Sequence, residues 1–192
     1  MFVDRQKLER DFLDEITKLG NLLDTIKVGY CMIGDCGLQA YNLKIHQTTD
    51  ADILIEDKSR NKTVELLFKL GYTVYQMDEK NVKIKKGNNK GDILLTLHFI
   101  KEDDKGNYVM SLEHKKLIFP KYIFDTNVSE VKGNLKNKMG KGYFKLAPLE
   151  VIYLLKMDIK NPSDINDLDL IRNSGEIDVD RLLSLFELNG WV

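Results

Sequence analysis

The sequence predicts an α+β fold, in which a small mixed sheet with flanking helices is followed by a helical C-terminal part. Near both ends of the chain, hydrophobic residues recur every three or four positions, which is typical of amphipathic helices. Between these ends, short apolar runs and alternating segments indicate β-strands. With 192 residues, 43% of them hydrophobic, the chain is long enough to bury one core of this kind.

The first expected elements are a long helix, a buried strand and a short helix. The long helix covers residues 4–26, and its apolar stripe consists of Leu8, Phe12, Ile16, Leu19 and Leu23. The apolar run over residues 28–33 indicates a buried strand that ends before Gly34. After this turn, residues 37–43 suit a short helix.

A second helix is expected among further strands. Residues 51–55 predict a strand, and residues 61–70 predict a helix that ends at Gly71. The packing face of this helix is expected to carry Val64, Leu67 and Phe68. Two short segments, residues 72–75 and 82–85, are expected to pair as a hairpin.

Residues 92–99 alternate in polarity, which predicts a half-buried strand. One face of this strand carries Ile93, Leu95, Leu97 and Phe99, and the other carries Asp92, Leu94, Thr96 and His98. The following stretch, residues 101–143, is rich in Lys, Asn and Gly and contains only short strand-like pieces.

The period of 3.6 residues returns after Pro148. We expect one helix over residues 148–157, a second that Ser163 caps, and a third over residues 178–188. The chain is therefore expected to divide into an α/β domain over residues 1–145 and a helical region over residues 146–192 that packs on it.

Composition narrows the classes of function. The formal net charge is -1, so no overall basic field attracts the protein to nucleic acid. The charged start of the chain indicates no secretory leader, and no apolar run reaches the roughly 20 residues that a membrane span needs. The two cysteines are too few for a disulfide scaffold or a four-ligand zinc site. We therefore expect a cytoplasmic protein without a membrane partner.

Two carboxylates at the start of a predicted strand are the strongest chemical signal. Residues i and i+2 of a strand point to the same face, so Asp50 and Asp52 are expected to point together while Ala51 packs into the core. Such a pair can hold Mg²⁺ or Mn²⁺ and leave coordination positions for substrate phosphates. Asp92, which opens the strand over residues 92–99, is the candidate for a third carboxylate in a two-metal site.

The same spacing occurs in Asp167 and Asp169, which fall on a predicted helix. There, residues i and i+2 diverge by about 200°, so the two side chains cannot chelate one ion jointly. An Asp-x-Asp pair at a strand start is also typical of a solvated strand edge. Spacing on a strand therefore supports a metal site but leaves this alternative open.

The ordered set closely resembles the nucleotidyltransferase superfamily related to DNA polymerase beta. That family has a strand, a Gly-Gly or Gly-Ser turn into a short helix, and an Arg-x-Thr-x-Asp-x-Asp segment on the next strand. Gly34 matches the first glycine, Thr48 the threonine, and Asp50 and Asp52 the metal carboxylates. Asp92 resembles the third carboxylate, which activates the acceptor hydroxyl.

The C-terminal part is similar to the AbiEii-type branch, which includes nucleotidyltransferase toxins of toxin–antitoxin and phage-defence systems. In that branch a helical lysine approaches the nucleotide phosphates, which implies this role for Lys156. A Lys-Asp-x-x-Asp-Leu signature follows in that branch, and residues 163–168, which include Asp164 and Asp167, are similar to it. From the sequence alone, Lys156 is equally consistent with an exposed cation near a helix end. Asp164 and Asp167 could position that lysine or the base, but negative charge in the first turn of a helix is also stabilising without such a function. A cognate antitoxin or toxin is the partner that this resemblance implies.

Two positions depart from the family pattern. Asp35 stands where the second glycine or serine faces the triphosphate, and a carboxylate there repels phosphate unless a metal or a lysine lies between them. His46 stands where the family has arginine, and it is a weaker, pH-dependent cation.

The resemblance implies transfer of a nucleoside monophosphate from a nucleoside triphosphate to a hydroxyl. Asp50, Asp52 and Asp92 would be catalytic and hold Mg²⁺ or Mn²⁺, while Gly34, Asp35, Thr48 and Lys156 would bind the nucleotide. The acceptor could be a tRNA end, a small molecule or a protein side chain. The alternative is a catalytically degenerate binding or regulatory module, such as one component of a toxin–antitoxin pair, and Asp35 and His46 support it.

Overall fold

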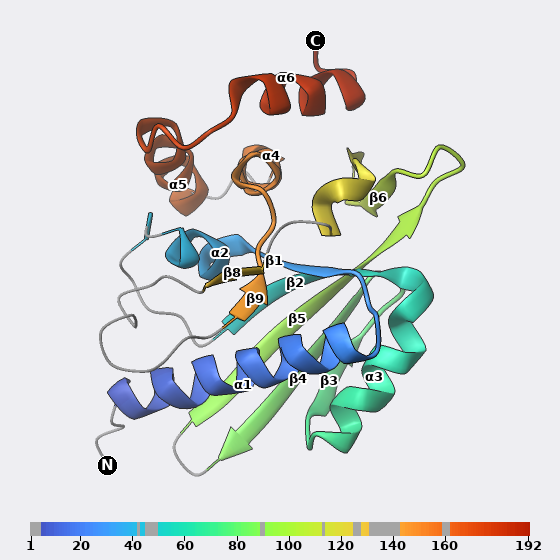
Figure 1. Ribbon diagram of the computed structural model, residues 1–192, viewed down its shortest axis with the longest axis vertical. Helices are drawn as coiled ribbons and strands as arrows, with labels where there is room; N and C mark the ends of the chain where they lie inside the picture. The colour runs from blue at the N-terminus through green and yellow to red at the C-terminus, as the bar shows by residue number, and fades with distance from the viewer. Residues whose placement is uncertain are drawn as a thin grey trace.

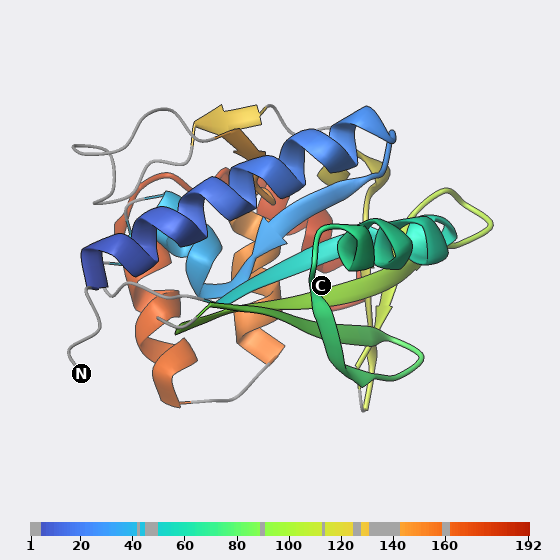
Figure 2. The same ribbon diagram turned by 90° about the horizontal axis from the view of Figure 1, so that it is seen from below.

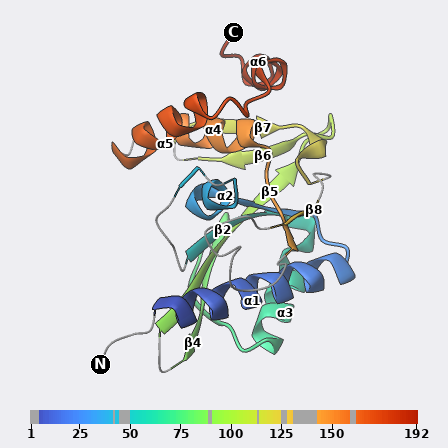
Figure 3. The ribbon, with the colours of Figure 1, turned by 60° about the vertical axis from the view of Figure 1, so that its left-hand side comes forward.

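The computed structural model describes residues 5–41, 43–44, 50–88, 91–112, 114–124, 128–130, 143–158 and 162–192. Its centre is a mixed sheet with helices on both faces (Figure 1). Seen from another side, helices α1 and α3 lie below this sheet, and α2 lies above it under the C-terminal helices (Figure 3). The fold is the α+β arrangement that the hydrophobic pattern predicts.

The central sheet has the strand order β1-β2-β5-β4-β3. These strands are β1 (Tyr30–Ile33), β2 (Asp50–Glu56), β5 (Gly91–Glu102), β4 (Asn81–Asn88) and β3 (Thr73–Met77). Strands β2 and β5 run parallel, whereas the pairs β1–β2, β4–β5 and β3–β4 are antiparallel. The predicted hairpin is therefore confirmed as β3–β4, and the predicted mixed sheet is confirmed as well.

Two smaller strand pairs follow β5. The end of β5 pairs with β6 (Tyr108–Ser111), which in turn pairs with β7 (Lys116–Phe119). Strands β8 (Val128–Glu130) and β9 (Tyr143–Lys145) form a separate antiparallel pair. Short 3-10 turns occupy Asp57–Ser59 and Lys121–Phe124.

Helix α1 (Arg5–Thr25) crosses one face of the sheet, as the view from below makes clear (Figure 2). Its stripe residues Phe12, Ile16, Leu19 and Leu23 are buried as expected, and the side chain of Leu8 lies outside the described residues. They form one core with Ala51, Ile53 and Ile55 of β2 and with Ile93, Leu95, Leu97 and Phe99 of β5. The alternation of β2 and β5 therefore turns their apolar faces toward α1 and their other faces away from it.

Helix α3 (Arg60–Lys69) connects β2 to β3, and the predicted Gly71 follows its C-terminal cap with a φ of +83°, which favours glycine. Leu67 is buried and Val64 packs against the core, as predicted. The expected burial of Phe68 is wrong, because 57% of its surface is exposed. Phe68 directly follows Leu67, so it is turned about 100° away from the buried stripe.

The C-terminal helices form a second layer beyond the other face of the sheet (Figures 1 and 3). They are α4 (Leu149–Asp158), α5 (Pro162–Asn173) and α6 (Val179–Leu188). Helix α5 begins at Pro162, so Ser163 lies in its first turn rather than capping it, whereas Asp178 caps α6 by accepting a hydrogen bond from the Arg181 backbone.

Helix α4 is buried almost throughout and shares a second core with α2 (Gly34–Ala40), β1 and β6. This core joins residues on both sides of position 145, and the division of the chain into two domains there stays a prediction. No helix in the described ranges is long and apolar enough to cross a membrane.

Candidate active site

The turn from β1 into α2 requires glycine for two reasons. Gly34 has a φ of +66°, a conformation that L side chains rarely adopt. A Cβ atom on Gly34 would also lie 2.8 Å from Asp52 Oδ2. The turn therefore brings the chain against a carboxylate of the neighbouring strand, and the short helix begins at Gly34 rather than at the predicted residue 37.

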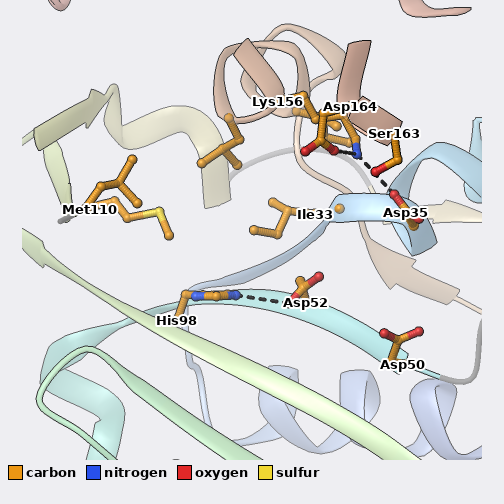
Figure 4. A pocket seen from close by; sticks show the side chains of 13 residues that line it. Ile33, Asp35, Asp50, Asp52, His98, Met110, Lys156, Ser163 and Asp164 are labelled. Carbon is orange, nitrogen blue, oxygen red and sulfur yellow. Dashed lines mark hydrogen bonds and ion pairs between the residues drawn. The ribbon is translucent and has the colours of Figure 1, made fainter. Parts of the chain in front are cut away.

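Asp50 and Asp52 line one cavity of about 310 Å³, to which β2, the β1–α2 turn, β5, β6, α4 and α5 all contribute. Figure 4 shows both aspartates on one side of this cavity, with Asp35, Lys156 and Asp164 on the other. Burial raises the pKa of Asp50, and the negative charges of Asp52 and Asp35 add to this increase. The strand geometry expected for Asp50 and Asp52 is thus present, and the close carboxylates make a site that attracts a cation.

Asp92 lies at the start of β5, on the same face of the sheet as Asp50. The parallel register places Leu94 opposite Asp50, so Asp92 lies two residues before the position on β5 that faces Asp50. The Asp92 Oδ2 atom is 3.8 Å from Lys85 Nζ, and Asp92 does not line the cavity. The structure therefore brings Asp50 and Asp52 together and leaves Asp92 at the margin, and its catalytic role stays a prediction.

His98 lies on β5 and contacts Asp52 directly. Its Nε2 atom is 3.1 Å from Asp52 Oδ1, and its Nδ1 atom is 2.8 Å from Asn81 Oδ1. The dashed line in Figure 4 marks the contact between His98 and Asp52. Because Asn81 on β4 fixes one edge of the ring, His98 holds the orientation of the Asp52 carboxylate.

Lys156 projects from α4 into a group of three carboxylates. Its Nζ atom lies 3.1 Å from Asp35 Oδ1, 2.8 Å from Asp164 Oδ1 and 2.6 Å from Asp167 Oδ2. Burial lowers the pKa of Lys156, but the three hydrogen bonds outweigh this effect and raise it overall. Asp164 and Asp167 therefore fix the position of the lysine that the sequence assigns to the nucleotide phosphates.

Lys44 is a site residue that the sequence analysis missed. It follows α2, and its Nζ atom lies 2.7 Å from Asp35 Oδ2 and 3.1 Å from Asp167 Oδ2. Partial burial raises the pKa of Asp35, but hydrogen bonds from Lys44 and Lys156 hold it below its usual value. The lysines required to compensate for a carboxylate at position 35 are thus in place. Lys44 belongs to no sequence pattern, and only the fold reveals its role.

The cavity also has apolar lining. Its apolar side chains are Ile33, Met110, Leu112, Ile152 and Leu155. Met110 lies at the far end of the view in Figure 4, away from Asp35 and Lys156. Met110 and Leu112 alternate with Val109 and Ser111, so one face of β6 and of the residue that follows it lines the cavity. The short strand-like pieces in residues 101–143 gave no sign of this contribution.

Three further residues near the site have different outcomes. Thr48 and His46 lie outside the described residues, so their roles stay predictions. Cys36 is buried, and this burial, together with the charges of Asp50, Asp52 and Asp35, raises the pKa of its thiol to about 12. Cys36 is therefore an unreactive packing residue.

The fit of a metal ion rests on two carboxylates. Among the residues that the structure describes, no group of three or more His, Cys, Asp or Glu side chains is close enough to hold a metal ion. Mg²⁺ is commonly bound by one or two carboxylates, with waters and substrate phosphates as its other ligands. Asp50 and Asp52 fit this mode, because they line one cavity and because burial and the nearby charge of Asp52 raise the pKa of Asp50.

No protein-family model and no curated protein sequence matches this chain. Solved structures do match it. The lincosamide antibiotic adenylyltransferase LnuA, solved with lincomycin, matches with a TM-score of 0.58 and 19% identity, over 83% of this chain and 95% of that chain. The antibiotic-resistance factor ANT(2'')-Ia matches with a TM-score of 0.56 and 13% identity, over 90% of this chain and 88% of that chain.

An antigenic nucleotidyltransferase-like protein from Paracoccidioides brasiliensis also matches, with a TM-score of 0.50 and 18% identity, over 83% of this chain and 74% of that chain. These structural neighbours are nucleotidyltransferases or resemble them. At such low identities the likeness concerns the fold, and the chain has the fold of these nucleotidyltransferases.

Proposed function

We propose that the protein transfers a nucleoside monophosphate from a nucleoside triphosphate to a hydroxyl group. The observation that carries this proposal is the placement of Asp50 and Asp52 on one face of β2, in a cavity that the Gly34 turn also lines. The Gly34 turn and the two aspartates on β2 also carry the sequence resemblance to nucleotidyltransferases. The fold of the solved neighbours supports the same assignment.

Asp50 and Asp52 would hold Mg²⁺ or Mn²⁺, which stabilises the charge of in-line phosphoryl transfer when it is bound. Other residues of the chain position the Asp52 carboxylate. His98 keeps the Asp52 carboxylate in one orientation, and Gly34 leaves room for that carboxylate against the turn. Asp92 is proposed as the third carboxylate, and from its place at the edge of the site it would act on the acceptor hydroxyl.

The acceptor in this proposal is a small molecule with an apolar part. The cavity is lined in part by the apolar side chains Met110, Leu112 and Leu155, and Met110 lies away from Lys156 (Figure 4). Such a wall suits the carbon skeleton of a small acceptor better than the phosphates of an RNA. Two of the similar structures contain lincomycin and adenylyl-2''-tobramycin, respectively, which are small molecules.

The direct test is label transfer from each α-labelled nucleoside triphosphate with Mg²⁺ or Mn²⁺. Separate reactions would contain total tRNA, a panel of small hydroxyl compounds, or cell extract. The wild type would be compared with Asp50→Asn, Asp52→Asn and the matched control Asp169→Asn, which removes the same charge from the outer face of α5. We expect label on a small molecule, loss of transfer in the first two variants, and retention in the control.

Label on tRNA would replace the proposed acceptor class while keeping the enzyme. Absence of transfer to every acceptor, together with absence of metal-dependent nucleotide binding in calorimetry, would overturn the enzyme assignment.

A second candidate is a binding module of the toxin–antitoxin type, in which the fold is retained without catalysis. The observation that favours it is the engagement of Lys156 by three carboxylates, which keeps this lysine from phosphates. The AbiEii-type branch, a cognate partner protein and a cytoplasmic location belong to this proposal. Co-purification of a defined partner with an inactive wild-type protein would support it, whereas activity of the isolated chain would exclude it.

A further inference from the structure

Five charged side chains form one network beside the cavity, and Asp35, Lys156 and Asp164 of this network line it. Lys44 and Lys156 supply two positive charges, and Asp35, Asp164 and Asp167 supply three negative charges. Each of the three carboxylates bonds Lys156, and Asp35 and Asp167 also bond Lys44. The two ammonium groups therefore share Asp35 and Asp167 as common partners.

The three carboxylates differ in their access to solvent. The side chain of Asp167 is 3% exposed and that of Asp164 is 11% exposed, whereas that of Asp35 is 48% exposed. Asp35 also lines the cavity, on the opposite side from Asp50 (Figure 4). Asp167 thus holds both lysines from the buried side and Asp164 holds Lys156, whereas Asp35 is the most exposed of the three carboxylates and faces the cavity.

The hydrogen-bonding capacity of Lys156 limits its access to a ligand. An ammonium group has three N–H donors, and the three carboxylates around Lys156 use all of them. A phosphate oxygen can reach Lys156 only if one carboxylate moves away. Asp35 is the carboxylate with the lowest cost of displacement, because water can solvate it as it leaves and because its ion pairs are the most screened.

We propose that Lys44 and Lys156 form a polyphosphate subsite whose position Asp35 occupies in this structure, so that an incoming triphosphate displaces the Asp35 carboxylate. The inference rests on the proposed function, since the ligand is the triphosphate of the nucleotide. Asp35 is then the residue that sets nucleotide affinity, and it acts as an internal competitor. Displacement exchanges one carboxylate for several phosphate oxygens with more negative charge, so polyphosphates bind and monophosphates compete poorly.

This arrangement also explains why a carboxylate is tolerated at position 35. Without the two lysines, Asp35 would add to the negative charge of Asp50 and Asp52 around the same cavity. With the lysines, Asp35 completes a network that fixes α2 against α4 and α5. Asp35 thus stabilises the network and competes with the triphosphate for the two lysines.

The test measures binding of inorganic tripolyphosphate to the full chain by calorimetry, without a divalent cation and at fixed ionic strength. The variants are Asp35→Asn, which keeps an oxygen acceptor for the lysines, and Asp35→Asn combined with Lys44→Met. The matched control is Asp169→Asn, which changes the net charge equally but lies outside the network. Thermal unfolding of each variant confirms that the protein compared is folded.

We expect Asp35→Asn to bind tripolyphosphate about tenfold more tightly than the wild type, since one competing charge at ion-pair distance is removed. The combined variant is expected to lose this gain, and the control is expected to match the wild type. Equal or weaker binding by folded Asp35→Asn would overturn the inference. A gain that persists without Lys44 would exclude Lys44 from the subsite.

This result is independent of the label-transfer test. If transfer occurs but Asp35→Asn leaves polyphosphate affinity unchanged, the proposed function stands and the inference fails. If Asp35→Asn binds polyphosphate tightly but no variant transfers label, the subsite stands and the enzyme assignment fails.

Discussion

The chain contains the same Asp-x-Asp spacing twice, on two different backbones. On strand β2, Asp50 and Asp52 point to one face and line one cavity. On helix α5, Asp167 is buried against Lys156, whereas Asp169 is exposed and its Oδ1 lies 3.6 Å from Arg172 Nη1. A period of two keeps paired carboxylates together and a period of 3.6 separates them. Identical spacing thus produces a candidate metal site in one region and one structural anchor in the other.

The largest expected effect separates these two regions by function. Replacing Asp52 with Asn removes a carboxylate that faces the cavity, and we expect transfer to fall by about 10²- to 10³-fold, as for loss of a charge-stabilising group. The free energy of unfolding is expected to change little, because the Asp52 side chain is 44% exposed. Single-turnover label transfer and urea unfolding measure the two quantities. A large loss of stability with intact transfer would contradict the assignment.

The second prediction concerns the helical pair. Replacing Asp167 with Asn leaves the ammonium groups of Lys44 and Lys156 partly uncompensated in a buried network, and we expect a loss of about 3 kcal/mol in unfolding free energy. The same change at Asp169 is expected to have no measurable effect, since its ion pair with Arg172 is exposed. Urea unfolding at neutral pH compares them. Equal losses in the two variants would show that burial does not distinguish these carboxylates.

A third prediction compares two glycines with positive φ. Gly34→Ala and Gly71→Ala both place a side chain in the left-handed region, at a cost of about 1–2 kcal/mol each. Only at Gly34 does the new Cβ meet a carboxylate, because nothing lies within 4 Å of the corresponding position at Gly71. Both variants are expected to lose similar stability, but only Gly34→Ala is expected to lose transfer. Loss of transfer in both would point to a general unfolding effect.

The contrast between these regions also explains which features of the fold and the site could be predicted from the sequence and which could not. Strand alternation depends on neighbouring residues, so the shared face of Asp50 and Asp52 followed from local pattern, as did the buried stripe of α1. The network around Lys156 depends on contacts across 121 residues, from Asp35 to α4, which no local period encodes. Lys44 and Met110 were missed for the same reason. Phe68 was misplaced because the buried face of α3 is centred on Thr63 and Leu67, and the apolar pattern does not mark Thr63 as buried.

The smallest expected effect concerns the pH dependence of stability at Asp50. Burial, and then the charges of Asp52 and Asp35, raise its pKa above the ordinary 3.8, so ionised Asp50 is less favourable in the folded chain than in the unfolded chain. The contribution of Asp50 to stability therefore falls as the pH rises from 3.8 through the folded-state pKa, and it is constant above that value. The uncharged side chain of Asp50→Asn removes this dependence.

Urea unfolding of wild type and Asp50→Asn across the acidic range checks this prediction. The stability of the variant relative to the wild type is expected to increase as the pH rises through the window above 3.8. A divalent cation should reverse the difference at neutral pH, because it binds the ionised wild-type carboxylate and stabilises the folded state. A constant difference at every pH would mean that Asp50 is solvated like an ordinary strand-edge aspartate. The β2 pair would then be no more a cation site than the α5 pair.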